Sequence, residues 1–326
     1  MVHVRAFPRI HISLLDLGNA TGRRYGGGGF NIDGHCTEVS AMLAQVDEIE
    51  GLDLVDDDAR KDVDRVLLAF RSFRANLPPI RISIRRVPPQ HVGFGTKTAL
   101  LLTILSAANL ETAAGLTQVE LQRLSGRGGT SGVGINLFFE GGFVCDLGHP
   151  SRQDMSFQPS SYSYVTEIPP IACRWNFPGI WRVLLVLPPG KRLAGASEGN
   201  FFRESTPLPS NQVLEAIAAM YHGVLPAVIT ADHELLSLAL GKIHKTGFKR
   251  LELEAQSEEV MRAYHQLSVI NGIAIGLSSL GPLLYGVVHE DDSQAIGSVE
   301  DWCLENDSVF LGSFRGRNQG CDVIHD

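Results

Sequence analysis

The sequence has little cysteine and no long hydrophobic run, and each shortage excludes a class of protein. Its five cysteines are scattered without Cys-x-x-Cys spacing, so neither a zinc site nor a disulfide framework is indicated. The longest apolar run, near residues 99–108, is too short to cross a bilayer, and the N-terminal segment lacks a signal-peptide pattern. A net charge of −8 does not indicate binding to nucleic acid or membranes. We therefore expect a cytoplasmic protein.

What the chain does have is the size and composition of a globular enzyme. It has 326 residues, of which 44% are hydrophobic and 20% charged, and this length favours two domains over one. A proline- and serine-rich segment at 150–170 is taken as the boundary between an N-terminal domain (1–165) and a C-terminal domain (166–326). Strand and helix patterns alternate without the rhythm of a doubly wound fold, so the predicted class is α+β.

Hydrophobic periodicity predicts most of the elements. Strands are expected at 9–17 and 80–85, and a fully apolar strand at 181–187. A glycine/serine turn within 272–288 should lead to another strand, and short strands should lie at 308–311 and 321–324. Residues 135–148, interrupted by Gly141 and Gly142, are predicted to form a hairpin. Apolar residues at helical spacing predict helices at 57–77, 97–110, 117–125, 210–223, 231–246 and 256–271.

The glycine-rich turn HVGFGTKT runs directly into the predicted helix at 97–110. Gly93 and Gly95 allow a tight turn and close approach to a ligand, and Thr96 or Thr98 is expected to cap the helix. Free N–H groups in the first helical turn, together with the charge of Lys97, would form an anion site. The alternative is a turn that only connects a strand to a core helix. The GxxxxGK[ST] spacing of a Walker A loop is absent.

Four segments resemble, in order, motifs of the GHMP kinase superfamily, and most closely its β-ribofuranosylaminobenzene 5′-phosphate synthase branch. PRIHISLLDLGNATGRRYGGGGF is similar to the opening PSRLHFGLIDL…GR…GG, and HVGFGTKTAL to the loop HVGLGSGTQ. GRGGTSGVGINLFFEGGFVCDLGH resembles RGGTSGIG…GGFIVDGGH, the most distinctive signature of the branch. GLSSLGPLLYGVV resembles GMSSFGPTVYAV, the third glycine motif of the superfamily. The resemblance spans essentially the whole chain.

The resemblance implies a GHMP-kinase-like fold, with a ribosomal-S5-domain-2-like N-terminal domain and a ferredoxin-like C-terminal domain. It also implies transfer of ribose 5-phosphate from phosphoribosyl pyrophosphate (PRPP) to a ring carbon of an aromatic carboxylic acid, with release of pyrophosphate and CO2. Mg2+ and a homodimer are implied as well. One alternative is a GHMP small-molecule kinase, against which the GRGGTSG and GGFVCDLGH segments argue. Another is a non-catalytic ligand-binding protein.

The chain departs from the branch at several positions that bear on the acceptor. Phe94, Thr96 and Lys97 replace Leu, Ser and Gly, Ala99 replaces Gln, and Arg24-Tyr25 stands where Ile-Asp is usual. These changes favour a smaller and more polar ring, and we expect a nitrogen heterocycle such as an aminopyrazole dicarboxylate, which would give a C-nucleoside precursor in an antibiotic pathway. The alternative is 4-aminobenzoate or 4-hydroxybenzoate, the acceptors of methanopterin-type synthesis.

The resemblance also assigns substrate-binding residues, which we expect to converge in a cleft. An arginine beside glycines and hydroxyls suits a phosphate, whereas the turn at 278–281 is equally well a simple connector. Arg23 is expected to hold the acceptor carboxylate, with Arg24 as the alternative. The other interpretation is that one of the pair is only a solvated surface arginine. The phosphate-binding candidates are Gly93, Gly95, Thr96, Thr98, Arg127, Gly129, Thr130, Ser131, Ser278 and Ser279.

Three residues are candidates for catalysis. Lys97 would stabilise the departing pyrophosphate, and His149, with an ordinary pKa of about 6.5, would move a proton, with Asp146 beside it. A packed, hydrogen-bonding histidine is the alternative for His149. His11 lies in the first motif and shares a strand face with Ser13. The candidate Mg2+ ligands are Asp16, which alternatively caps the following turn, Glu198 and Glu204.

Overall fold

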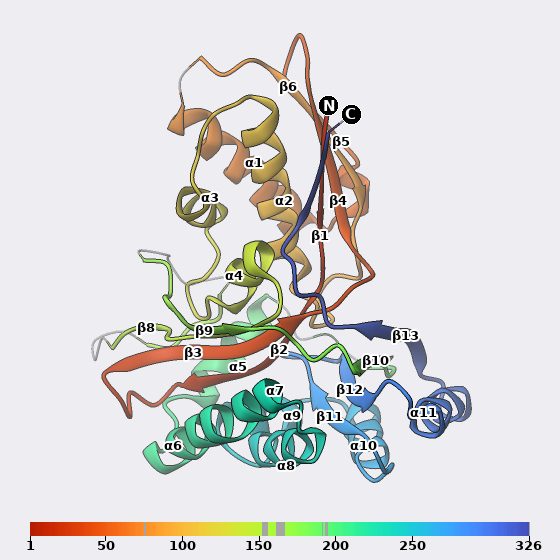
Figure 1. Ribbon diagram of the computed structural model, residues 1–326. Helices are drawn as coiled ribbons and strands as arrows, with labels where there is room; N and C mark the ends of the chain where they lie inside the picture. The colour runs from red at the N-terminus through yellow and green to blue at the C-terminus, as the bar shows by residue number, and fades with distance from the viewer. Residues whose placement is uncertain (75, 152–155, 161–166, 191, 193–194, 326) are drawn as a thin grey trace.

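The computed structural model describes residues 1–74, 76–151, 156–160, 167–190, 192 and 195–325, which form three antiparallel-rich sheets with helices (Figure 1). The first sheet has the strand order β14-β1-β4-β6-β5, with bounds Asp322–His325, Val2–Ala6, Thr37–Leu43, Ile80–Arg86 and Glu48–Glu50. Helices α1 (Asp57–Phe73), α2 (Thr96–Glu111) and α3 (Gln118–Ser125) pack together, with α2 against β1 and β4. Buried Ile80, Ile82 and Ile84 confirm the alternating strand predicted here.

The second sheet crosses the middle of the molecule (Figure 1), and its first strand supplies Arg9, His11 and Leu14 to the cavities described below. Its strands are β2 (Arg9–Asp16), β3 (Arg23–Asn31), β7 (Phe143–Asp146) and β9 (Ile171–Trp175), and β8 (His149–Pro150) pairs with β3. The hairpin expected at 135–148 is wrong, because residues Val133–Glu140 form helix α4. Its apolar run suits a buried helix as well as a strand, and Gly141, at φ 58°, ends the helix instead of turning a hairpin.

The third sheet has the order β11-β12-β10-β13, with bounds Ala274–Leu277, Leu284–His289, Trp181–Leu187 and Val309–Arg315. Most of the helices of the second half lie around it and under the second sheet (Figure 1). They are α5 (Ala196–Ser205), α6 (Ser210–Ala219), the π-turn η2 (Met220–Val224), α7 (Leu225–Thr230), α8 (His233–Ile243), α9 (Gly247–Glu254), α10 (Glu258–Leu267) and α11 (Ser293–Glu305). A short 3-10 turn, η1 (Leu52–Leu54), precedes α1.

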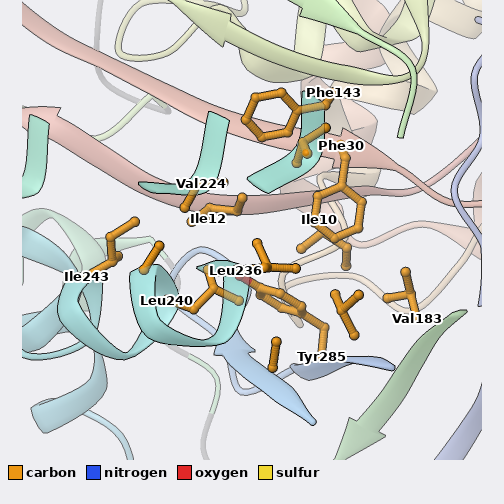
Figure 2. Close-up of a cluster of buried hydrophobic side chains, with 14 of the residues drawn as sticks. Ile10, Ile12, Phe30, Phe143, Val183, Val224, Leu236, Leu240, Ile243 and Tyr285 are labelled. Carbon is orange, nitrogen blue, oxygen red and sulfur yellow. The ribbon is translucent and has the colours of Figure 1, made fainter. Parts of the chain in front are cut away.

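A single large core joins the second and third sheets. Figure 2 shows Ile10 and Ile12 of β2 facing Val224, Leu236 and helix α8, with Tyr285 of β12 in the same cluster. Beyond residue 166, β9 pairs with β7 and β14 pairs with β1, so two strands of the second half complete sheets of the first. The proposed boundary near residue 165 stays a prediction.

One helical run, Ser210–Thr230, is long and apolar enough to cross a membrane by length and composition alone. Within its most apolar window, 44% of the residues are buried in the protein. Val213, Ala216, Met220 and Val224 of this run are buried in the clusters around the second sheet. These contacts are those of a core helix.

Candidate functional site

Two adjoining cavities of about 110 and 120 Å³ lie where three turns meet the start of β2. The turns are those at 93–98, 127–131 and 278–281, so their predicted convergence is confirmed. The residues common to both cavities are Arg9, Thr98, Arg127, Glu198, Ser279 and Leu280. His11, Leu14, Thr130, Ser131, Phe202 and Glu252 line the first cavity, and Gly93, Gly95, Thr96 and Lys97 the second.

Ser278 holds two of these turns together. Its hydroxyl donates to the carbonyl of Gly93 at 2.8 Å and accepts the backbone N–H of His11 at 3.2 Å. The N–H of Ser279 returns a bond to the carbonyl of His11 at 3.0 Å. Ser278 is fully buried and does not line either cavity, so the structure places it as a cross-link between turns and not at the ligand surface.

Gly93 has a packing reason as well as a conformational one. Its φ is 115°, and a Cβ there would lie 2.5 Å from the carbonyl oxygen of Ser278. The space beside this glycine is therefore filled by the neighbouring turn, and close approach of a ligand is not what requires it. Gly129 is buried within its own turn and does not line either cavity.

A buried ion pair on α9 holds the turn at 278–281 in place through hydrogen bonds to backbone carbonyls. Lys249 has no exposed side-chain surface, and its Nζ lies 2.6 Å from Oε2 of Glu252. The ammonium also donates to the carbonyls of Leu277 and Ser279, at 3.1 and 3.0 Å. Burial lowers the pKa of Lys249, and the adjacent Glu252 carboxylate opposes that shift. Sequence reasoning missed this pair because both residues lie between the helices expected at 231–246 and 256–271, in a segment for which no helix was predicted.

Helix α2 begins without the threonine cap that the sequence suggested. Its N-cap is Gly95, at φ 71°, and no side chain caps it. The Thr96 hydroxyl donates to the carbonyl of Pro89 at 3.0 Å, while the Thr98 hydroxyl accepts from Nε of Arg127 at 3.1 Å. The N–H of Ala99 is the first to bond within the turn, to the carbonyl of Gly95. The amides of residues 96–98 precede it and are available to an anion.

Lys97 lines the second cavity but already has a counter-charge. Its Nζ lies 3.2 Å from Oδ2 of Asp62 on α1, and the side chain is 18% exposed. The expectation that a bound anion must compensate a lysine at this helix start is therefore weakened, because Asp62 supplies the compensation.

Two arginines are the main cations of the site. Arg9 donates to the carbonyl of Gly93 at 2.9 Å, and Arg127 to the hydroxyl of Thr98 and the carbonyl of Ser160. Desolvation by burial, assisted by the charge of Arg127, lowers the pKa of Arg9 to about 10, and desolvation also lowers the pKa of Arg127. Within the described ranges, neither guanidinium forms an ion pair with a carboxylate. Sequence reasoning singled out Arg127 but not Arg9, whose only signal was its place in the first motif.

Ser131 lines the first cavity and bonds to the buried carboxylate of Asp146 behind it. The Ser131 hydroxyl donates to Oδ2 of Asp146 at 2.8 Å, and Nε2 of His11 lies 3.3 Å from the same hydroxyl oxygen. Burial raises the pKa of Asp146 to about 6, although bonds from Ser131 and the backbone oppose the shift. Burial, with the charges of Arg9 and Lys249, holds the pKa of His11 well below its usual range. Asp146 is buried and reaches the cavity through Ser131.

Three other predicted residues lie away from the cavity lining. Nε2 of His149 donates to the carbonyl of Gly128 at 2.8 Å, behind the second turn, and burial lowers the pKa of His149. The Arg23 guanidinium donates to the carbonyls of Leu147 and Gly148. Arg24 is buried, with its guanidinium 4.5 Å from the ring centre of Phe157. None of the three side chains lines either cavity, although His149 bonds to the backbone of the second turn, and this is a correction to their predicted roles.

Of the three candidate metal ligands, Glu198 lines the cavities and Asp16 and Glu204 do not. Both oxygens of Asp16 accept bonds from the following turn, from the N–H groups of Gly18, Ala20 and Thr21 and the Thr21 hydroxyl, so Asp16 is a turn cap. Glu204 is exposed on α5 and lines neither cavity. Glu198 lines both, and burial raises its pKa against the opposing charge of Arg127. No group of three or more His, Cys, Asp or Glu side chains suited to a metal occurs in the described part of the chain.

Comparison with known proteins agrees with the family resemblance of the sequence motifs. No family model matches the sequence. The chain is 32% identical over 324 residues to a β-ribofuranosylphenol 5′-phosphate synthase of Archaeoglobus fulgidus, covering 99% of both chains. It is 30% identical over 321 residues to the enzyme of the same name from Methanothermobacter thermautotrophicus, covering 97% of this chain and 96% of that one.

Solved structures establish the fold. Homoserine kinase from Cytophaga hutchinsonii superposes with a TM-score of 0.68 at 15% identity, covering 99% of this chain and 97% of that one. Phosphomevalonate kinase from Streptococcus pneumoniae superposes with a TM-score of 0.70 at 11% identity, covering 96% and 98%. The predicted α+β, GHMP-kinase-like fold is confirmed, and at these identities the likeness concerns the fold alone.

Proposed function

The chain belongs to the family of β-ribofuranosylphenol 5′-phosphate synthases, and on that premise we propose that it joins ribose 5-phosphate from PRPP to a ring carbon of an aromatic carboxylic acid. Pyrophosphate and CO2 leave, and the product is a C-riboside. The observation that carries the proposal is the cavity between the three turns, where Arg9 and Arg127 form no close ion pair with a carboxylate among the described residues. The charges of Glu252 and Glu198 in the same cavity oppose, without reversing, the desolvation that lowers the pKa of the two arginines. Desolvated guanidinium groups are costly unless an anion pairs with them, and they bind phosphates with two hydrogen bonds.

The pyrophosphate leaving group would be held in the second cavity, beside the turn at 93–98. The amides of residues 96–98, together with Arg9 and Arg127, present donors and positive charge toward one space. Such a preorganised set stabilises the charge that develops on pyrophosphate as the bond to C1 breaks. Lys97, paired with Asp62, adds a weaker contribution from the rim.

The residues fit a magnesium ion that arrives with PRPP. Mg2+ is commonly held by one or two carboxylates together with substrate phosphates, and Glu198 faces the same cavity as the two arginines. Glu252 lines the first cavity from the other side, where Lys249 neutralises it. We therefore assign Glu198 as the side chain that would hold Mg2+, which neutralises charge on the departing pyrophosphate when bound.

The acceptor is proposed to be a hydroxybenzoate. The relatives that share this chain's full length are named for a ribosylphenol product. Leu14, Phe202 and Leu280 give the first cavity an apolar wall that suits a benzene ring. The argument for a polar heterocycle is weakened at three of its six positions, because Phe94 is buried in the main core and Arg24 and Tyr25 pack with Phe157 away from the cavity. Thr96 and Lys97 do line the second cavity.

The test is an incubation of the purified protein with PRPP and Mg2+ and three acceptors: 4-hydroxybenzoate, 4-aminobenzoate and an aminopyrazole dicarboxylate. We expect pyrophosphate and CO2 in equal amounts with 4-hydroxybenzoate, and loss of both in the Arg127→Met variant. Turnover of the aminopyrazole acid alone would restore the heterocyclic assignment. Consumption of ATP with no use of PRPP would overturn the proposal in favour of a kinase. The homodimer rests on the family resemblance, and light scattering of the same sample tests it.

A further inference from the structure

Ser131 connects the cavity to a carboxylate that the cavity itself does not reach. Its Oγ lies 2.8 Å from Oδ2 of Asp146, accepts the N–H of Val133 at 3.1 Å, and lies 3.3 Å from Nε2 of His11. Asp146 is 1% exposed and stands behind the serine, whereas Ser131 lines the cavity. A proton released in the cavity therefore has a path of two hydrogen-bonded groups to a buried base.

The directions of these bonds follow from the single proton of a hydroxyl. Ser131 donates that proton to Asp146, so its oxygen must accept from the Val133 amide and from an Nε2–H of His11. Because its pKa is strongly lowered, His11 is neutral near pH 7 and serves to orient the serine. The other oxygen of Asp146 accepts the N–H of Gly148 at 2.8 Å, which fixes the carboxylate.

We propose that Ser131 and Asp146 form a proton relay that removes the hydroxyl proton of a hydroxybenzoate acceptor during C–C bond formation and returns it afterwards. This inference rests on the proposed function. Ser131 is the catalytic residue, because it alone of the two would touch the acceptor, and Asp146 acts through it. The relay replaces the role that the sequence suggested for His149, whose Nε2 is bonded to the Gly128 carbonyl.

The proposed step balances in atoms and electrons. The acceptor hydroxyl takes the place of His11 Nε2, whose contact with Ser131 is the longest at 3.3 Å, and gives its proton to Oγ of Ser131 as the serine proton passes to Asp146. The resulting oxyanion pushes electron density to the ring carbon that bears the carboxylate. That carbon bonds to C1 of PRPP as the C1–oxygen bond to pyrophosphate breaks. The ring carbon then loses CO2, whose bonding electrons return to the ring and restore the phenolate. Asp146 returns the proton through Ser131, so the enzyme ends as it began.

Other titratable groups surround Asp146 and need a control. His11 of β2 contacts Ser131, and Cys145 adjoins Asp146 on β7. Tyr221 lies on η2, where burial, together with the charges of Cys145 and Asp146, raises its pKa. A hydrogen bond with the neighbouring Cys173, together with burial, raises the pKa of Cys145, and the same hydrogen bond lowers the pKa of Cys173 to about 7. Cys173 is therefore the neighbour whose titration would overlap with that of the relay, and Cys173→Ser is the matched control.

The experiment compares kcat/KM against pH for 4-hydroxybenzoate and for a ring-fluorinated 4-hydroxybenzoate whose hydroxyl is already ionised at pH 8. The carboxylate must be ionised to accept a proton, so activity with 4-hydroxybenzoate should be present above the pKa of Asp146, about 6, and fall about tenfold per pH unit below it. Asp146→Asn and Ser131→Ala should each lower turnover of 4-hydroxybenzoate by about 100-fold or more. Cys173→Ser should keep the wild-type profile.

The fluorinated acceptor separates a relay from a structural role. Because its proton is already lost, we expect the Asp146→Asn and Ser131→Ala variants to use it at within about tenfold of the wild-type rate. Binding of inorganic pyrophosphate by calorimetry shows that each variant is folded, and Ser131→Ala serves alone if Asp146→Asn does not fold. Equal losses with both acceptors, or unchanged turnover of 4-hydroxybenzoate in both variants, would overturn the relay and leave the proposed function standing. A wild-type protein that makes no pyrophosphate from PRPP overturns both.

Discussion

Arg9 offers the sharpest test of the anion site, because its effects on binding and on stability should have opposite signs. In Arg9→Met the cavity loses one of its two arginines, and a hydrogen bond to a charged group contributes about 1.5–3 kcal/mol. Affinity for pyrophosphate should therefore fall about 10- to 150-fold.

Without ligand, the same substitution should cost little. The carbonyl of Gly93 that accepts from Arg9 also accepts from the Ser278 hydroxyl at 2.8 Å, so it keeps a partner. Methionine has no charge to desolvate, and a desolvated cation without a carboxylate partner is unfavourable. We expect the unfolding free energy of the free Arg9→Met protein to equal or exceed that of the wild type.

The assay is urea unfolding with and without inorganic pyrophosphate, with affinities from calorimetry. At a concentration 100 times the wild-type Kd, pyrophosphate should stabilise the wild type by about 2.7 kcal/mol. A variant with 100-fold weaker binding would gain only about 0.4 kcal/mol. Arg182→Met, on β10 beside Glu290, is the matched control and should retain the full stabilisation. If pyrophosphate protects Arg9→Met as well as it protects the wild type, Arg9 does not belong to the anion site.

Three further changes test the scaffold and the rim. Lys97→Ala should raise the KM for PRPP by less than about tenfold, as measured by initial rates, because the lysine is paired with a carboxylate; a 1,000-fold loss would place it directly on the pyrophosphate. Lys249→Met should lower the unfolding free energy by about 3–5 kcal/mol in urea by leaving Glu252 buried and unpaired, and adding Glu252→Leu should recover most of the loss; no recovery would contradict the ion-pair argument. Gly93→Ala should be strongly destabilising in thermal unfolding, since its Cβ meets a backbone oxygen at 2.5 Å, whereas Gly179→Ala has open space and should be near neutral; equal melting temperatures would refute this.

The regular elements were predictable because they depend on local periodicity. The alternation at 80–85 and the helical spacing at 57–73 each place apolar side chains on one face, and the structure buries those faces. The segment 133–140 was not predictable in this way. Its residues are almost continuously apolar, so neither a period of two nor one of 3.6 can be read from them.

The backbone turns of the site were predictable from the sequence, whereas the side chains that face the cavity were not. The three turns were recognisable from glycines and from family motifs, and the structure brings them together. Which side chains face the cavity was decided by partners distant in the chain: Ser278 is occupied by Gly93 and His11, and Lys97 by Asp62. A sequence window contains none of these partners, so it cannot tell an occupied polar group from an available one.

The sequence by itself determined the family, the class of fold and the turns that build the site, because these depend on backbone conformation and on motifs that are contiguous in the chain. Only the tertiary structure decided the chemistry of the cavity. It set Arg9 beside Arg127, placed Ser131 between the cavity and Asp146, and turned His149 and Arg23 away onto backbone carbonyls. Charge, desolvation and hydrogen bonding act through space between residues that lie from 15 to 125 positions apart in the chain, and folding alone brings those residues within reach of one another.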